Sequence, residues 1–131
     1  MRPLVLFLLG LVVVFGLLAA AIVLTRPSER VFVVVDSSFP MRDVWNQVPA
    51  VLDEIEDEGY AEFALATEKD LVHTWRPAFR LRSQTVYAPC DFADIETYAE
   101  AAEADALVLV TTSASCPTDG LAGWEVRTLE P

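Results

Sequence analysis

Basic residues are scarce in this chain of 131 residues. Nine Lys and Arg stand against twenty Asp and Glu, which gives a formal net charge of −11. Binding to nucleic acid or to a phosphate-rich membrane surface requires a basic patch that displaces counterions. The charge therefore argues against nucleic acid as a partner. The acidity itself has two explanations, which are solubility of the domain and recognition of a cationic partner.

The chain also lacks the short motifs that mark common enzyme and cofactor sites. It contains no Walker loop, no dinucleotide-binding glycine pattern, no HExxH and no GxSxG. Its single histidine, His73, falls in a predicted strand, where we expect it to be partly exposed. Its two cysteines do not have the Cys-x-x-Cys spacing. This pattern supports neither a zinc site nor a cysteine protease, and we expect a binding module rather than an enzyme.

A long apolar run opens the sequence. Residues 4–24 contain no charge and no proline, and at about 1.5 Å per helical residue they span about 30 Å, the thickness of a hydrocarbon core. Residues 1–30 are therefore predicted to form a single-pass membrane anchor and a short linker. A cleaved secretory signal is the alternative, because residues 19–21 are alanines that resemble a cleavage site. The run is, however, longer than the usual signal core of about 7–15 residues.

The charges around this run do not decide its orientation. Arg2 favours a cytoplasmic N-terminus, whereas Arg26 and Arg30 oppose it. Two cysteines and few lysines suit an oxidising compartment. We therefore expect the cell membrane, with the globular part outside the cytoplasm.

Residues 31–131 are predicted to form one acidic α/β domain, because about 100 residues sustain a single hydrophobic core. The runs 31–35 and 107–110 have the composition of buried central strands. The other predicted elements are a helix from Pro40 to Gly59, an antiparallel hairpin at 61–67 and 71–75, a strand at 85–88, a helix at 95–104 and an edge strand at 124–129. This order predicts a mostly parallel, open, Rossmann-like sheet with flanking helices.

Two local features of the domain need an explanation. Pro49 lies inside the first predicted helix, where it either kinks the helix or marks its true start. Arg76, Arg80 and Arg82 form the only basic cluster of the domain. Our interpretation is that these arginines neutralise nearby acids.

Ligands of open parallel sheets bind at the carboxyl ends of the strands. Three predicted loops lie there, at 36–41, 88–94 and 111–117. We expect a partner protein, part of a membrane complex, to bind these loops. The contact residues that we predict are Phe39, Met41, Asp91, Thr112 and Ser113.

The first of these loops has the sequence Asp36-Ser37-Ser38-Phe39-Pro40-Met41. Together with the elements that follow it up to the run 106–112, it resembles the von Willebrand factor A family. The resemblance implies a doubly wound sheet and a metal ion-dependent adhesion site, in which an Asp-x-Ser-x-Ser motif, a threonine and a second aspartate bind a divalent cation. Asp36 and Ser38 match its first two positions. Pro40 replaces the last serine and Thr112 stands where the family usually has aspartate, so the site is degenerate. No cofactor is expected beyond a weakly bound cation such as Mg²⁺.

The two cysteines, Cys90 and Cys116, follow strands that are predicted to be parallel neighbours. Both sulfur atoms would then lie at the same end of the sheet, and we expect a disulfide, as in other extracytoplasmic proteins. Two reduced thiols that bind metal or act in catalysis are the alternative.

These observations together predict a membrane-anchored recognition domain. A small membrane-tethered hydrolase or thiol enzyme that uses Asp36, Cys90 or Cys116 is the alternative. A scaffold subunit of a larger membrane assembly is a third possibility, for which the acidic surface and the short linker are sufficient.

Overall fold

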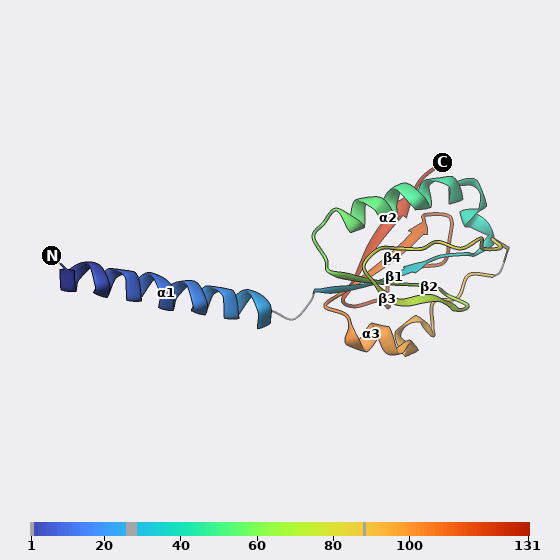
Figure 1. Ribbon diagram of the computed structural model, residues 1–131. Helices are drawn as coiled ribbons and strands as arrows, with labels where there is room; N and C mark the ends of the chain where they lie inside the picture. Colours follow the sequence, from blue (N-terminus) through green and yellow to red (C-terminus); the bar gives the residue numbers. More distant parts are fainter. Residues whose placement is uncertain (1, 26–28, 88) are drawn as a thin grey trace.

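The computed structural model describes residues 2–25, 29–87 and 89–131. Within these ranges an apolar N-terminal helix precedes an α/β domain whose five strands form one sheet, in the order β3-β2-β1-β4-β5 (Figure 1). The helices are α1 (Arg2–Thr25), α2 (Val48–Glu56) and α3 (Ala99–Glu103), with 3-10 turns η1 (Phe39–Asp43), η2 (Trp45–Gln47) and η3 (Ile95–Thr97). The strands are β1 (Arg30–Val35), β2 (Glu62–Thr67), β3 (Leu71–Arg76), β4 (Ala106–Thr112) and β5 (Trp124–Leu129).

The sheet is mostly parallel, as the sequence predicts. Strand β1 pairs in parallel with β2 and with β4, and β4 pairs in parallel with β5. Only β3 is antiparallel, to β2, in the predicted hairpin. Strand β1 is central, and its β-branched residues are buried because the sheet is covered on both faces.

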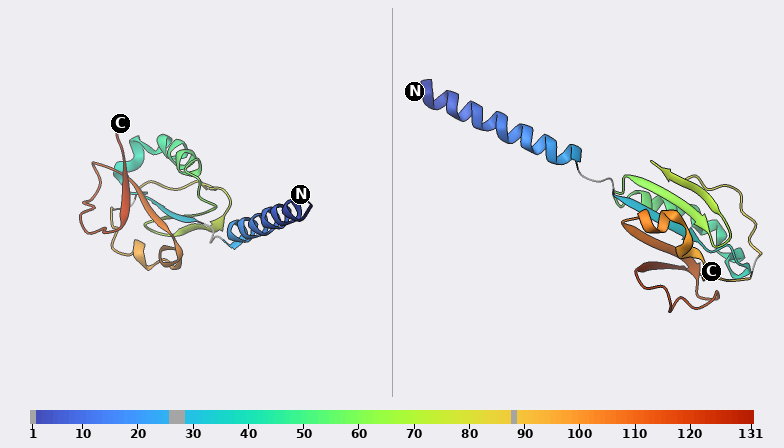
Figure 2. Two further views of the ribbon diagram at one scale, coloured as in Figure 1. Left: turned by 90° about the vertical axis from the view of Figure 1, so that its left-hand side faces the viewer. Right: turned by 90° about the horizontal axis from the view of Figure 1, so that it is seen from below.

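Two layers cover the sheet (Figure 2). On one face α2 packs Val48, Leu52 and Ile55 against alternate residues of β1, and on the other face Phe92 and Ile95 pack against the remaining residues. This division follows from the strand period of two, which sends neighbouring side chains to opposite faces. Each layer therefore has its own hydrophobic core.

The predicted helices and one predicted strand differ from the structure. The long helix after Pro40 is instead two 3-10 turns followed by α2, which has Pro49 in its first turn, where a missing N–H costs nothing. The predicted helix 95–104 is divided at Tyr98, whose backbone is extended (φ −61°, ψ 136°). The predicted strand 85–88 is wrong: residues 85–87 are irregular, and residue 88 lies outside the described residues.

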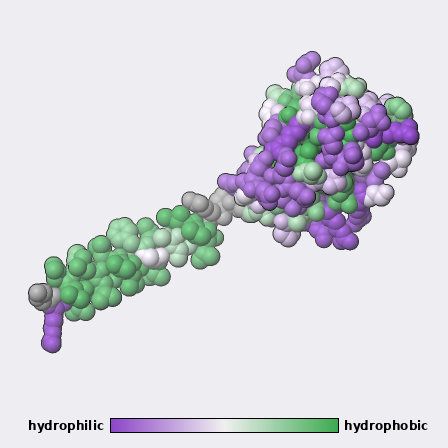
Figure 3. Space-filling model, turned by 90° about the horizontal axis from the view of Figure 1, so that it is seen from above, coloured by the Kyte–Doolittle hydropathy of each residue, from purple (hydrophilic) through white to green (hydrophobic). Residues whose placement is uncertain are grey.

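Helix α1 is long and apolar enough to cross a membrane, although a signal sequence passes the same test. Its 24 residues span about 36 Å, and its apolar surface contrasts with the polar surface of the domain (Figure 3). The chain from α1 enters the sheet at the amino end of β1. The carboxyl ends of the parallel strands therefore lie at the far end of the domain from α1 (Figure 1). We call that end the carboxyl edge.

Candidate functional site

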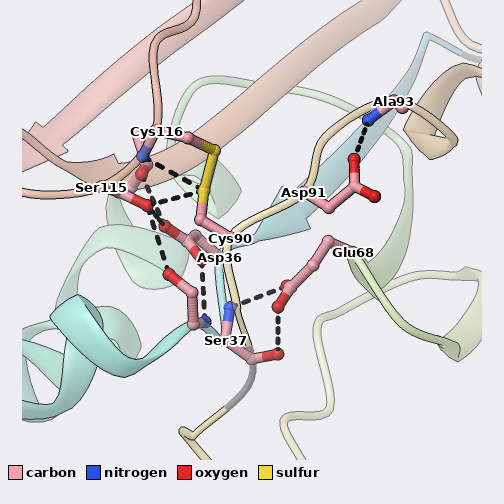
Figure 4. Close-up of a disulfide and its surroundings, with 10 residues drawn as sticks. Asp36, Ser37, Glu68, Cys90, Asp91, Ala93, Ser115 and Cys116 are labelled. Atoms are coloured by element: carbon pink, nitrogen blue, oxygen red, sulfur yellow. Dashed lines mark hydrogen bonds between the residues drawn. A yellow bond between two sulfur atoms is a disulfide. The ribbon is translucent and has the colours of Figure 1, made fainter.

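A buried carboxylate joins two loops at the carboxyl edge (Figure 4). Asp36, directly after β1, is fully buried. Its Oδ1 accepts the backbone N–H of Ser38 at 2.8 Å, and its Oδ2 accepts the hydroxyls of Thr111, at 2.7 Å, and Ser115. We call these four residues the Asp36 network. Because two of its three donors, Thr111 and Ser115, come from β4 and the loop after it, the network fixes the β1 loop against the β4 loop.

The Asp36 network does not fit a divalent cation. A hard cation takes about six oxygen ligands, several of them carboxylates or waters, whereas here one carboxylate is already satisfied by three neutral donors. The hydroxyl oxygens of Ser38 and Ser115 lie 3.2 Å apart, which is a hydrogen-bonding distance. Among the described residues no group of three or more His, Cys, Asp and Glu side chains could hold a metal ion. The arrangement is that of a structural hydrogen-bond network.

A disulfide joins Cys90 to Cys116 beside this network, with 5.7 Å between the two Cα atoms. The predicted pairing is therefore present, although Cys90 follows an irregular segment rather than a strand. Both cysteines of the chain are used in this bond. A thiol nucleophile is consequently not available while the disulfide is intact.

A second carboxylate, which the sequence analysis missed, positions the same loop from the other side. Glu68 accepts the backbone N–H of Ser37 with one oxygen and the Ser37 hydroxyl with the other, both at 2.8 Å (Figure 4). Glu68 lies in the turn between β2 and β3. The only available signal was its place directly after a strand that ends at the carboxyl edge.

The predicted contact residues divide into two groups. Phe39, Asp91 and Ser113 are exposed, and Asp91 accepts the N–H of Ala93 within its own loop. Met41 is fully buried in the core beneath α2, and Thr112 is 4% exposed as the last residue of β4. The prediction that Met41 and Thr112 face a partner is therefore wrong, because their positions in the fold turn both side chains inward.

Three exposed apolar side chains lie at the same end of the sheet, the carboxyl edge. Outside α1, the exposed large hydrophobic residues of the described chain are Phe39 (59%), Leu71 (39%) and Tyr87 (68%). Phe39 follows β1, and Leu71 opens β3 directly after the β2–β3 turn. Tyr87 lies against that turn, because the Nζ atom of Lys69 is 4.7 Å from its ring centroid. All three side chains thus belong to one end of the sheet, although they come from separate segments.

The chain matches no protein-family model, no curated protein and no solved structure. The resemblance to the von Willebrand factor A family therefore stays a prediction. The structure itself shows an α/β domain with a mostly parallel sheet.

Hydroxyl groups line a hollow of about 320 Å³ beside the Asp36 network. Thr111, Ser113, Ser115 and Thr118 contribute to its wall, and Asp119 is the one carboxylate among the lining residues. A hydroxyl nucleophile needs an adjacent base such as an imidazole. No histidine lines this hollow, and the carboxylate of Asp36 is occupied by its three donors.

The single histidine is held in a neutral form away from this hollow. His73 is 8% exposed, not partly exposed as predicted. Its Nε2 accepts the N–H of Arg80 at 3.0 Å, so its Nδ1 carries the proton and donates to the Thr74 carbonyl at 2.8 Å. Burial lowers the pKa of His73 below the ordinary value of 6.5, and the positive charge of Arg76 acts in the same direction. The ring therefore serves the packing of β3.

Proposed function

We propose that this chain is a single-pass membrane protein whose acidic domain, on the outer side of the cell membrane, binds a partner protein through the carboxyl edge of its sheet. The observation that supports this is the placement of Phe39, Leu71 and Tyr87. Exposed apolar patches with a polar rim mark protein interaction sites, and aromatic residues are enriched there. These three residues all lie at the end of the sheet that is far from α1.

The architecture of this edge suits recognition. The Asp36 network, the disulfide and the Glu68 contacts hold the loops after β1 and β4, so that Phe39 is presented by a rigid frame. Rigid presentation lowers the entropy that binding costs. Binding at this edge also leaves α1 free for the bilayer.

A role in recognition accounts for these groups better than catalysis does. The cysteines are paired, the Asp36 carboxylate is saturated with hydrogen bonds, and His73 is neutral and buried. The cysteines, Asp36 and His73, which are the groups singled out as candidate nucleophiles or bases, are thus committed to structural contacts. Enzymes instead keep such groups accessible and poised for proton transfer.

Site-specific photo-crosslinking in native membranes tests the proposal. A photoreactive residue is placed at position 39 or 71, and as a matched control at position 54, which is exposed on α2. We expect positions 39 and 71 to label the same protein and position 54 not to label it. The paired substitution Phe39→Ser with Leu71→Ser should reduce recovery of that protein about 10-fold or more, since each buried apolar anchor contributes about 1–2 kcal/mol. Equal labelling from position 54, or no labelled protein from either edge position, contradicts the proposal.

A further inference from the structure

An acid-free stretch interrupts the otherwise acidic α/β domain. Residues 71–90 contain no Asp or Glu, whereas they contain Arg76, Arg80 and Arg82. Within the described parts of the chain, ion pairs form at Arg30 and Arg127 and at none of these three arginines. The interpretation that they neutralise nearby acids is therefore wrong. The domain carries a local excess of positive charge.

Half-buried and exposed side chains alternate in this stretch, with a shift at Arg82 and Ser83, which are both exposed. Phe79, Leu81 and Val86 are half-buried and pack against the core beneath α2. Arg80 and Arg82, which lie between or beside them, are exposed, as is Tyr87. Alternation on each side of this shift is typical of an extended chain. We call residues 79–87 the arginine segment.

Among the described residues, the backbone of the arginine segment has no strand partner. Its described contacts use side chains: the N–H of Phe79 donates to Glu56, the N–H of Arg80 donates to His73, and the carbonyl of Thr85 accepts from Lys69. No backbone hydrogen bond joins residues 79–87 to another backbone group in the ranges that the structure describes. Exposed backbone groups on an extended chain are a template for pairing with a further extended segment.

We propose that the arginine segment binds an extended acidic segment of the partner protein, with Arg80 and Arg82 pairing with its carboxylates and Tyr87 packing against an apolar side chain. This inference rests on the proposed function, because Tyr87 also belongs to the carboxyl edge, and it specifies the chemistry of the partner. The planar guanidinium group matches a carboxylate with two parallel hydrogen bonds. At physiological ionic strength the Debye length is about 8 Å, so acids elsewhere on the domain are largely screened from a ligand at this segment.

A protein fits this segment better than an anionic lipid surface does. A bilayer would be approached by the end of the sheet where the chain leaves α1, and Glu62, Glu103 and Asp105 lie there, around Arg30. These carboxylates repel anionic headgroups. The end of β3 lies at this same end of the sheet, but the arginine segment runs away from it: the N–H of Arg80 donates to His73, three residues before the end of β3, and Tyr87 lies at the carboxyl edge.

A synthetic peptide provides the test. The probe is a fluorescent ten-residue peptide of alternating Glu and Val, and its binding to the full chain in neutral detergent micelles is followed by fluorescence anisotropy. We expect binding that weakens with added salt. The variant Arg80→Ala with Arg82→Ala should bind about 2- to 30-fold more weakly, as expected for the loss of two exposed ion pairs. The control variant, Ala102→Glu with Ala122→Glu, makes the same change of net charge at exposed positions outside the segment and should bind within about 2-fold of wild type.

The outcomes separate the alternatives. No binding of the probe, or equal loss in both variants, overturns the inference. A lipid-binding segment would lose the probe when the chain is moved from phosphatidylcholine nanodiscs to nanodiscs that contain phosphatidylserine, whereas a peptide-binding segment keeps it. If crosslinking from positions 39 and 71 persists unchanged in the Arg80→Ala, Arg82→Ala variant, the inference fails and the proposed function stands. If crosslinking from these positions is absent although the probe binds, the proposed function fails.

Discussion

Removal of the Asp36 carboxylate tests whether the Asp36 network stabilises the fold. Asp36→Ala removes the acceptor of two buried donors, the N–H of Ser38 and the hydroxyl of Thr111, and of one half-buried donor, the hydroxyl of Ser115. Each buried donor that loses its partner costs about 1–3 kcal/mol. The two hydroxyls can rotate towards other acceptors, so we expect a total loss of about 3–5 kcal/mol in the free energy of unfolding.

The assay is urea unfolding of the full chain in detergent micelles, followed by the fluorescence of the buried Trp124. Asp91→Ala is the matched control, because that carboxylate is exposed and accepts a single N–H within its own loop. The control should lose less than about 1 kcal/mol. Addition of Mg²⁺ should not stabilise wild type, since a ligand stabilises the native state only where it has a site. A loss below about 1 kcal/mol in Asp36→Ala, or clear stabilisation by Mg²⁺, refutes the description of a structural network.

Three further predictions follow from the structure. In the variant Cys90→Ser with Cys116→Ser, the free energy of unfolding in urea should fall by about 3.5 kcal/mol, because the disulfide no longer lowers the entropy of the unfolded chain by closing a loop with a sequence separation of 26. A fall below about 1 kcal/mol, or a variant that dithiothreitol still destabilises, contradicts this prediction. Because the pKa of His73 is lowered in the folded state, the unfolded chain binds more protons below about pH 6.5. The free energy of unfolding should therefore fall as the pH falls through that value, and the His73→Gln variant should lack this pH-dependent loss. An imidazole NMR titration midpoint at or above 6.5 refutes the prediction. The full chain with α1 should stay in the membrane pellet after alkaline extraction with its N-terminal peptide detectable by mass spectrometry; a mature chain that begins near Ile22 and is recovered in the supernatant refutes the anchor.

Much of the fold follows from local sequence patterns. The β-branched runs at 31–35 and 107–110 predict buried strands because only a sheet covered on both faces accommodates them. The prediction of a strand at 85–88, by contrast, is wrong. Residues 79–87 alternate between half-buried and exposed except at Arg82 and Ser83, but a strand also needs a neighbouring backbone for hydrogen bonds, and no single-sequence pattern shows whether that neighbour exists.

The site was only partly predictable. Asp36 and Ser38 stand out because polar residues follow a buried strand, and the two cysteines follow from topology and compartment. The partners of Asp36, however, lie 75 and 79 positions along the chain, so their hydroxyls could be assigned only after β1 and β4 were paired. Met41 is buried and not at the surface as predicted, because a short 3-10 turn, rather than a regular helix, sets the direction of its side chain.

The sequence by itself determined the apolar N-terminal helix, the mostly parallel α/β architecture and the acid-free stretch at 71–90, because hydrophobic period and charge are local properties of the chain. Tertiary structure alone decided that Asp36 is a saturated structural carboxylate, that His73 is neutral and buried, and that the arginine segment lacks both ion pairs and a strand partner among the described residues. These properties depend on which distant groups meet and on how much water is excluded where they meet. Neither is set by the identity of the nearest neighbours in the chain.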